Sequence, residues 1–302
     1  MKPTLLRILS GIVTLISLLG AARGQIVVAN YGSNSVGVYD AATGALINAS
    51  FITGSILPLG LAQAGSSLFV INGSTDAIGL YDATTGALIN GSLVTGLSGA
   101  REVVVAGSNL FVTNATSNTI GEYTTSGATV NAALVSGLNI SIGLAVSGST
   151  LYVANYNSGT IGAYDATTGA VINASLVTGL FSPAGLAVTG STLYVANFAI
   201  GSVGEYNATT GAAINASFIT GLGNPRSLVV SGSTLFVSDL GLGTIGEYDA
   251  TTGAVINASL ISGLNNPQGF LLFTGIPEPS TVACMATGLA ALGVAAIRRR
   301  KL

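Results

Sequence analysis

The sequence predicts an all-β fold: a six-bladed β-propeller built from four-stranded blades. Three observations predict it. A segment of about 42 residues is repeated six times, each copy contains four short segments typical of β-strands, and helical periodicity is confined to the two ends of the chain. A fixed period of this size, with four strands in each copy, is typical of propeller blades.

The period is visible in two positions of the repeat. A tyrosine in an apolar-Gly-x-Tyr element recurs at Tyr39, Tyr81, Tyr123, Tyr164, Tyr206 and Tyr248. An Asn or Asp closes the apolar run before it, at Asn30, Asn72, Asn114, Asn155, Asn197 and Asp239. A β-solenoid is the alternative fold. Solenoid coils are usually shorter and lack two hairpin turns in each coil.

The N-terminal residues 1–24 predict a signal peptide that forms a single helix. Lys2 and Arg7 precede an apolar stretch over residues 8–19, and the small residues Ala22 and Gly24 follow. This order predicts cleavage before Gln25. A transmembrane anchor is the alternative, but the stretch is shorter than the ~20 residues that a span needs.

Residues 276–302 form the other targeting end. Pro277, Glu278 and Pro279 precede an apolar segment that predicts a transmembrane helix over 282–297, and Arg298, Arg299, Arg300 and Lys301 follow directly. Clustered cations after a span hold that end in the cytoplasm. Spacing alone indicates a short C-terminal membrane anchor.

These three parts in order resemble a PEP-CTERM sorting signal. The resemblance implies a Gram-negative bacterium, processing by an exosortase near the Pro-Glu-Pro motif, and delivery to the cell surface or an exopolysaccharide matrix. An ordinary single-span anchor, which would keep its C-terminal tail, is the alternative.

The propeller domain is expected over residues 25–275. First-strand segments begin near Gly60, Glu102, Gly143, Gly185, Ser227 and Gly269, while the chain opens at residue 26 with a second strand. The last segment, 269–273, must therefore complete the blade begun by the first three strands and close the ring. The run Tyr152-Val153-Ala154-Asn155 with Tyr164-Asp165, and its copies, resembles YVTN and NHL-like propeller repeats.

Composition excludes some partners. Residues 25–275 contain ten acidic residues and only Arg101 and Arg226 as bases, which gives a net charge of −8. Such a domain repels nucleic acid, so DNA and RNA are not expected as partners. The single cysteine, Cys284, lies in the sorting segment and histidine is absent. We expect a monomer without disulfide, cofactor or metal.

Two sets of polar residues recur with the repeat. Asp40, Asp82, Asp165, Asn207 and Asp249 precede Thr-Gly turns, where Asx-turn chemistry is a better interpretation than calcium binding. Asn48, Asn90, Asn131, Asn173, Asn215 and Asn257 lie on the fourth strand, and five of them form Asn-x-Ser sequons. We interpret them as a polar edge that discourages pairing with other chains.

The copies differ most where each first strand begins, at Leu59, Arg101, Ile142, Ala184, Arg226 and Gln268. Arg101 and Arg226 are three blades apart and should face each other across the central mouth, beside Glu102. The loops on that face contribute Tyr31, Asp76, Asn118, Tyr156 and Phe198. Two guanidinium groups with nearby aromatic rings predict a site for an anionic sugar or a carboxylate.

The favoured function is a non-catalytic binding or scaffold module for exopolysaccharide or proteins. The alternative is a lactonase-like hydrolase with a metal at the central channel. Such a site needs several inward acids or histidines, and the repeats supply few. A third possibility is a structural array without a ligand. The sequence does not separate the first possibility from the third.

Overall fold

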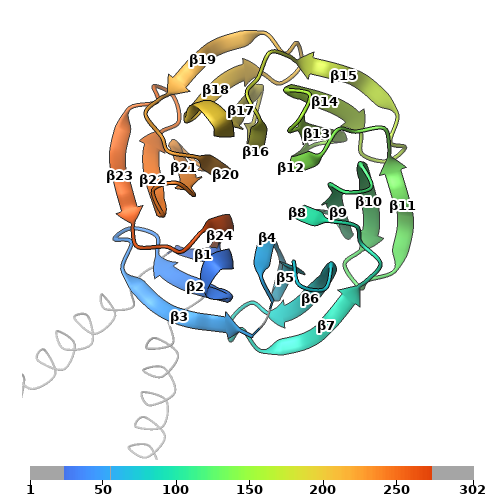
Figure 1. Cartoon of the computed structure of the whole chain (residues 1–302), viewed down its shortest axis with the longest axis vertical. Helices are drawn as coiled ribbons and strands as arrows, with labels where there is room; N and C mark the ends of the chain where they lie inside the picture. The colour runs from blue at the N-terminus through green and yellow to red at the C-terminus, as the bar shows by residue number, and fades with distance from the viewer. Residues whose placement is uncertain (1–23, 55, 274–302) are drawn as a thin grey trace, which may run out of the picture.

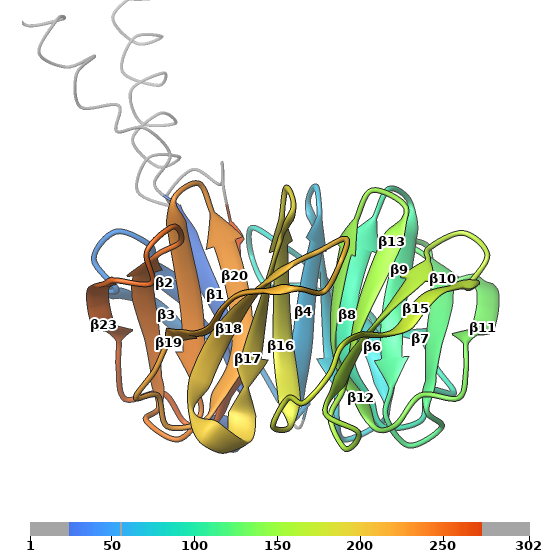
Figure 2. The same ribbon diagram turned by 90° about the horizontal axis from the view of Figure 1, so that it is seen from above.

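A computed structural model describes residues 24–54 and 56–273, which form a ring of six sheets around a central axis (Figure 1). Seen from the side, the inner strands stand parallel to this axis (Figure 2). No helix within those residues is long and apolar enough to cross a membrane. The predicted signal peptide, the sorting signal and the helices at both ends fall outside the described residues.

Each sheet is one antiparallel blade of four strands. Blade 1 contains β24 (Pro267–Phe273), β1 (Gln25–Asn30), β2 (Ser35–Asp40) and β3 (Leu46–Thr53). Blade 2 contains β4 (Pro58–Ala64), β5 (Ser67–Asn72), β6 (Ala77–Asp82) and β7 (Leu88–Val94). Blade 3 contains β8 (Ala100–Ala106), β9 (Asn109–Asn114), β10 (Thr119–Thr124) and β11 (Thr129–Val135). A short 3-10 helix, η1 (Tyr31–Ser33), joins β1 to β2.

The other half of the ring repeats this plan. Blade 4 contains β12 (Ser141–Ser147), β13 (Thr150–Asn155), β14 (Thr160–Asp165) and β15 (Val171–Val177). Blade 5 contains β16 (Pro183–Thr189), β17 (Thr192–Asn197), β18 (Ser202–Asn207) and β19 (Ala213–Ile219). Blade 6 contains β20 (Pro225–Ser231), β21 (Thr234–Asp239), β22 (Thr244–Asp249) and β23 (Val255–Ile261). A second 3-10 helix, η2 (Phe198–Ile200), joins β17 to β18.

Ring closure occurs as the sequence predicts. The last strand, β24, pairs antiparallel with the first, β1, in a register that sets Val27 against Leu271. Blade 1 is thus assembled from both extremities of the described chain. Pairing β1 along its inner edge leaves no open edge between the two ends of the ring.

The repeated Asn, Gly and Tyr pack together within a blade, and an Asn–Tyr side-chain hydrogen bond forms in blades 1, 3, 4 and 5. In blade 4 the side chain of Asn155 on β13 hydrogen-bonds the hydroxyl of Tyr164 on β14. The Tyr164 ring lies back over Gly162, where a Cβ atom would come within 2.6 Å of the ring. The glycine is needed because the aromatic ring occupies the space of a side chain, which explains the Gly-x-Tyr spacing.

The turns between third and fourth strands show Asx-turn chemistry. Asp165 Oδ1 accepts hydrogen bonds from the N–H groups of Thr167 (3.0 Å) and Thr168 (2.8 Å) and from the Thr168 hydroxyl (2.8 Å). These bonds favour the ionised carboxylate and lower the pKa of Asp165. The turn then packs on the preceding blade, since a Cβ at Gly169 would collide with the carbonyl oxygen of Leu134.

The inner strands begin two residues earlier than expected, at Pro58, Ala100, Ser141, Pro183, Pro225 and Pro267. Their pairing with the second strand is irregular near that end. In blade 3 the register shifts between Ala100 and Val103, so the chain bulges at residues 101 and 102. A bulge interrupts the ladder and re-aims side chains. The sequence pattern consequently predicts a loop, and not a strand, for the first two residues of each inner strand.

Residues 171–176 alternate in sequence, which predicts that Val171, Asn173 and Ser175 share one face of the outer strand and that the other face is buried. The structure departs from this prediction. In β15, Val171 and Ile172 are both exposed (63% and 58%), and burial begins only at Leu176. The pairing of β14 with β15 shifts register twice, so alternation is lost. Asn173 Oδ1 accepts the N–H of Ser175 (3.0 Å) at this irregularity, which gives the repeated Asn-x-Ser a structural cause.

Candidate functional site at the channel mouth

The mouth is the face where the inner strands begin. The loop between second and third strands reaches this face in each blade and bonds to the segment that leads into the inner strand. Two such bonds run from Tyr156 N–H to the Ile140 carbonyl (3.1 Å) and from Phe198 N–H to the Ser182 carbonyl (3.3 Å). Inner-strand starts and loop residues from different blades therefore share one surface.

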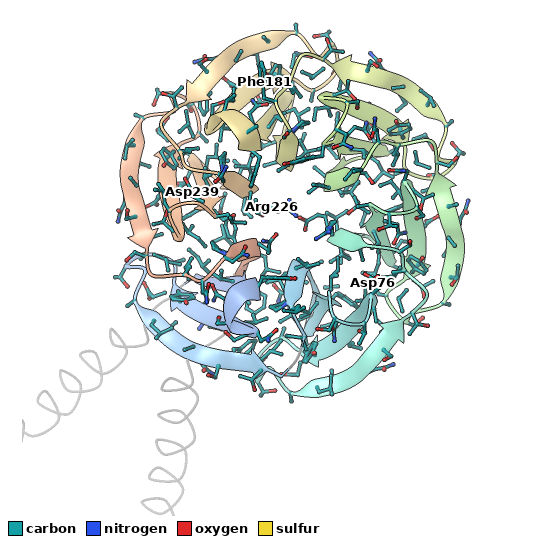
Figure 3. All side chains as sticks on the ribbon, viewed as in Figure 1. Asp76, Phe181, Arg226 and Asp239 are labelled. Carbon is teal, nitrogen blue, oxygen red and sulfur yellow. The ribbon has the colours of Figure 1, made fainter. Side chains whose placement is uncertain are left out.

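Blades 3 and 6 carry the two arginines of the domain, and they are three blades apart in the ring. Figure 3 shows Arg226 directed toward the centre of the ring. Its side chain is 8% exposed, and its Nε donates to Gln268 Oε1 (2.9 Å). Gln268 Nε2 in turn donates to Asn266 Oδ1 (2.5 Å). Arg226 is thus held from the neighbouring blade 1, whereas Arg101 is exposed.

Glu102 is half-buried beside the same opening. Desolvation raises the pKa of Glu102 to about 7, although the charge of Arg226 and the N–H of Val103 oppose that rise. Burial lowers the pKa of Arg226, and the neighbouring Arg101 adds to this, while Glu102 and Tyr156 oppose it. These charges interact across one space, and a strongly perturbed carboxyl in a cleft marks a candidate functional site.

A buried hydroxyl supports each arginine-bearing bulge. The Glu102 N–H donates to Thr113 Oγ1 (2.8 Å) in blade 3, and the Ser227 N–H donates to Ser238 Oγ (2.9 Å) in blade 6. Both hydroxyl side chains are fully buried. Neither Thr113 nor Ser238 is among the site residues predicted from the sequence. The signal was present, because the four other copies have Ala or Ile at this position: Ala29, Ile71, Ala154 and Ala196.

The channel below the mouth is narrow because most copies have glycine one residue after the arginine position. A Cβ at Gly60 would come within 2.8 Å of the Glu102 Cα, and one at Gly185 within 2.8 Å of the Ser227 Cα. Glu102 and Ser227 are the two exceptions in this ring of glycines. A cavity of about 320 Å³ follows the inner strands of all six blades, with Glu102 and Ser227 at one end and Val and Leu side chains beyond.

The structure brings together some of the predicted aromatic residues but not all. Tyr156 and Phe198 lie in contact, with ring centroids 6.1 Å apart and planes tilted by 57°. Tyr156 also lies close enough to Arg226 to influence its pKa. Tyr31, in the loop after β1, packs against an apolar cluster of blades 2 and 3 that includes Leu59 and Ala100, two residues at the starts of inner strands.

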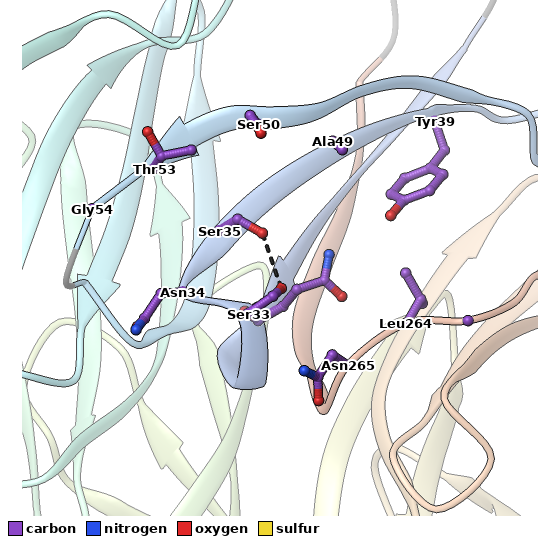
Figure 4. A pocket seen from close by; sticks show the side chains of 12 residues that line it. Ser33, Asn34, Ser35, Tyr39, Ala49, Ser50, Thr53, Gly54, Leu264 and Asn265 are labelled. Carbon is purple, nitrogen blue, oxygen red and sulfur yellow. Dashed lines mark hydrogen bonds between the residues drawn. The ribbon is translucent and has the colours of Figure 1, made fainter.

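A larger cavity, about 630 Å³, lies where blade 6 leads into blade 1, between the loop after β1 and the outer strand β3 (Figure 4). Its lining contains serine, threonine and asparagine side chains and no charged group. The buried Asn30 Oδ1 there has no hydrogen-bond partner. We place the candidate site at the mouth because only the mouth combines charged groups, perturbed pKa values and dedicated supporting bonds.

No group of three or more His, Cys, Asp or Glu side chains converges within residues 24–54 and 56–273. Asp239, the one acid in the repeated Asn position, has a structural role. Its carboxylate accepts N–H bonds from Gly223 (2.6 Å), Asn224 (2.9 Å) and Leu242 (3.0 Å).

Comparison with known proteins supports the fold alone. No protein-family model matches the sequence, and no curated protein matches it either. Among solved structures, a chain in the crystal structure of a nidogen/laminin complex aligns with a TM-score of 0.73 at 15% identity, covering 84% of this chain and 100% of that one. The computationally designed Ika8 protein aligns over 81% of this chain and 74% of its own at 17% identity, with a TM-score of 0.49 that adds nothing to the argument.

Proposed function

We propose that this protein is an exported, surface- or matrix-directed β-propeller that acts as a non-catalytic binding or scaffold module, with its ligand site at the channel mouth. One observation carries the proposal. Two departures from the repeat, an arginine on the inner strand and a hydroxyl on the second strand, coincide in blades 3 and 6 and in no other blade. Random sequence divergence among the six copies would not place the same two kinds of substitution together in two blades on opposite sides of one opening.

The ligand group is an anion. Arg101 and Arg226 are the only basic residues of an otherwise acidic domain, and both start inner strands. Guanidinium groups bind carboxylates and similar anions through paired N–H donors. Glu102 offsets one of these charges only when ionised. The inner strands offer one carboxyl group and the chain contains no histidine, which suits binding better than hydrolysis.

The export half of the proposal is supported by the two ends of the sequence. The N-terminal segment predicts a signal peptide, and Pro277, Glu278, Pro279 and the arginines 298–300 predict an exosortase-processed sorting signal. The membrane is then a transient partner, through the helix expected at 282–297. The nidogen/laminin structure supports the binding half in general terms, because it holds a propeller of this fold in a protein complex.

The binding half is tested with the full chain in detergent, probed with polygalacturonate as an acidic polymer and dextran as a neutral one. We expect polygalacturonate alone to bind, and Arg101→Ala/Arg226→Ala to lower its affinity by at least about tenfold, which corresponds to 1.4 kcal/mol. Arg226→Lys keeps the charge but loses the bond to Gln268, and should bind with intermediate affinity. Unchanged binding by the double variant would refute a ligand site at the mouth.

The export half has a separate readout. Mass spectrometry of the protein recovered from the cell surface or matrix should find a mature N-terminus at Gln25 and no peptide beyond the Pro-Glu-Pro motif. An intact C-terminal tail on protein recovered from the membrane would favour a simple anchor. Recovery of the unprocessed chain in the cytoplasm would contradict export.

A further inference from the structure

Among the described residues, the exposed bulky apolar side chains of the mouth face all lie on one side of it. Its blade 4 to 6 side carries six bulky apolar residues, which we call the apolar half-face: Ile140, Tyr156, Phe181, Phe198, Ile200 and Leu242. Phe181, Ile200 and Leu242 are 57%, 54% and 60% exposed. On blades 1 to 3 the loop residues 32–34, 73–76 and 116–118 are Gly, Ser, Thr, Asn and Asp, and the bulky apolar residues Tyr31 and Leu57 are half-buried.

Contacts between neighbouring blades link most of the apolar half-face to the mouth. Tyr156 bonds to the Ile140 segment, and its ring contacts Phe198. The Ala199 N–H donates to the Phe181 carbonyl (3.3 Å), which joins η2 to the next connector. Asn224 Nδ2 donates to the Phe198 carbonyl (3.1 Å) and links blade 5 to the Arg226 strand. Figure 3 places Phe181 much farther from the axis than Arg226, so the surface extends outward from the cationic centre.

We propose that the mouth and the apolar half-face together bind an extended protein segment, which sets an acidic side chain near Arg101 and Arg226 and bulky apolar side chains on blades 4 to 6. This inference rests on the proposed function and names its partner. Charge selects the partner, because both basic side chains of residues 25–275, Arg101 and Arg226, lie at this mouth. Arginine and tyrosine beside a partly exposed apolar surface are also the residues that dominate protein-binding energy.

A polysaccharide fits this surface less well. Three of the six residues are aliphatic, and a chain that presents mainly hydroxyl groups cannot bury them favourably. Tyr156 and Phe198 are half-buried and tilted against each other, so neither offers a free flat face to a sugar ring. Removing the exposed aliphatic and aromatic side chains from water is favourable only against an apolar partner.

The proposal is tested by selecting displayed random peptides on the full chain in detergent. Enriched peptides should combine Asp or Glu with bulky apolar residues. Binding of a synthetic copy of the most enriched peptide should fall at least about tenfold in Phe181→Ser/Ile200→Ser/Leu242→Ser and in Arg101→Ala/Arg226→Ala. The matched control, Leu88→Ser/Ile172→Ser/Ile256→Ser, removes three equally exposed side chains (62%, 58% and 55%) from the outer strands and should bind like the wild type.

Other results overturn the proposal in distinguishable ways. If no peptide is enriched while polygalacturonate binds and depends only on the arginines, the mouth functions but its partner is an acidic polysaccharide. If enriched peptides bind equally to the control and to the triple half-face variant, the apolar half-face is not the docking surface. If peptide and polymer both bind Arg101→Ala/Arg226→Ala as tightly as the wild type, the proposed function fails together with this inference.

Discussion

The inner and outer strands of this propeller are both only partly covered by neighbouring strands, but the six copies of the repeat are nearly identical on the outer strands and differ on the inner ones. The outer strands repeat almost the same residues, from Leu46–Thr53 to Val255–Ile261. The inner strands place Leu, Arg, Ile, Ala, Arg and Gln at one equivalent position. The outer strands repeat the same residues because each has the same irregular pairing and the same local hydrogen bond to the repeated Asn side chain. Variation on the inside, supported by buried hydroxyls, marks a surface where each blade contributes something different.

The largest effect is expected where the repeated framework joins adjacent blades. Gly211 has φ +71°, and a Cβ there would collide with the Leu176 carbonyl of the preceding blade. Gly211→Ala should lower the free energy of unfolding by roughly 3 kcal/mol, since backbone strain and collision add. Gly221→Ala is the control: φ is +79° with nothing within 4 Å, so about 1 kcal/mol is expected. Equal losses in chemical denaturation would show that blade contact contributes nothing.

The next effect concerns Glu102 at the mouth. Its pKa is raised from 4.5 to about 7, so the folded protein holds a proton that the unfolded chain releases. Stability should therefore fall as pH rises from about 4.5 to about 7, by roughly 2–3 kcal/mol, and level off above. Glu102→Gln should lack this decline. Asp82, Asp165 and Asp249 have lowered pKa values and act with the opposite sign, below pH 4 or so.

Denaturation curves at several pH values would measure both trends in one series. Wild-type stability that does not change between pH 5 and 7, or a decline that persists in Glu102→Gln, would contradict the burial assigned to this carboxyl group.

A smaller effect is expected at the hydroxyl that supports the blade 3 bulge. Thr113→Val keeps the shape but leaves the Glu102 N–H without its acceptor, which should cost about 1–2 kcal/mol and weaken anion binding. Thr119→Val removes an exposed hydroxyl on the next strand, bonded only to Ser117 (3.0 Å), and should change stability by less than about 0.5 kcal/mol. Thermal unfolding of the two variants compares them directly, and identical curves would remove the special role given to Thr113.

The smallest effect is expected on the outer strands. Ile172→Lys places a charge on a side chain that is already exposed and should alter stability by less than about 0.5 kcal/mol while leaving anion binding unchanged. A marked loss of ligand affinity in this variant would mean that the outer rim, and not the mouth, contacts the ligand.

The sequence predicts the fold because its period, turn residues and strand signals agree with one another. The closing role of the final strand follows from counting strands, and the positions of Arg101 and Arg226 follow from the six-fold repeat. The bulges are not predictable in this way. They begin the inner strands earlier, and they expose both Val171 and Ile172, because pairing irregularities depend on neighbouring strands.

The site was only partly accessible to sequence reasoning. Arg226 and Arg101 look equivalent in the repeat, but tertiary packing buries one against Gln268 and exposes the other. Thr113 and Ser238 could have been found as departures from Ala or Ile at one repeat position. Tyr31 packs against apolar side chains of blades 2 and 3 that include Leu59, and this contact between blades could not be read from the repeat because it depends on the local course of the loop.

The most direct measurement is hydrogen exchange of the full chain with and without polygalacturonate or the most enriched peptide. The central claim is that ligands bind where the inner strands of blades 3 and 6 begin. It predicts slowed exchange at residues 100–103 and 225–228, no change along the outer strands, and no protection in the double arginine variant. Protection confined to the outer strands, or the same pattern in that variant, would contradict the claim.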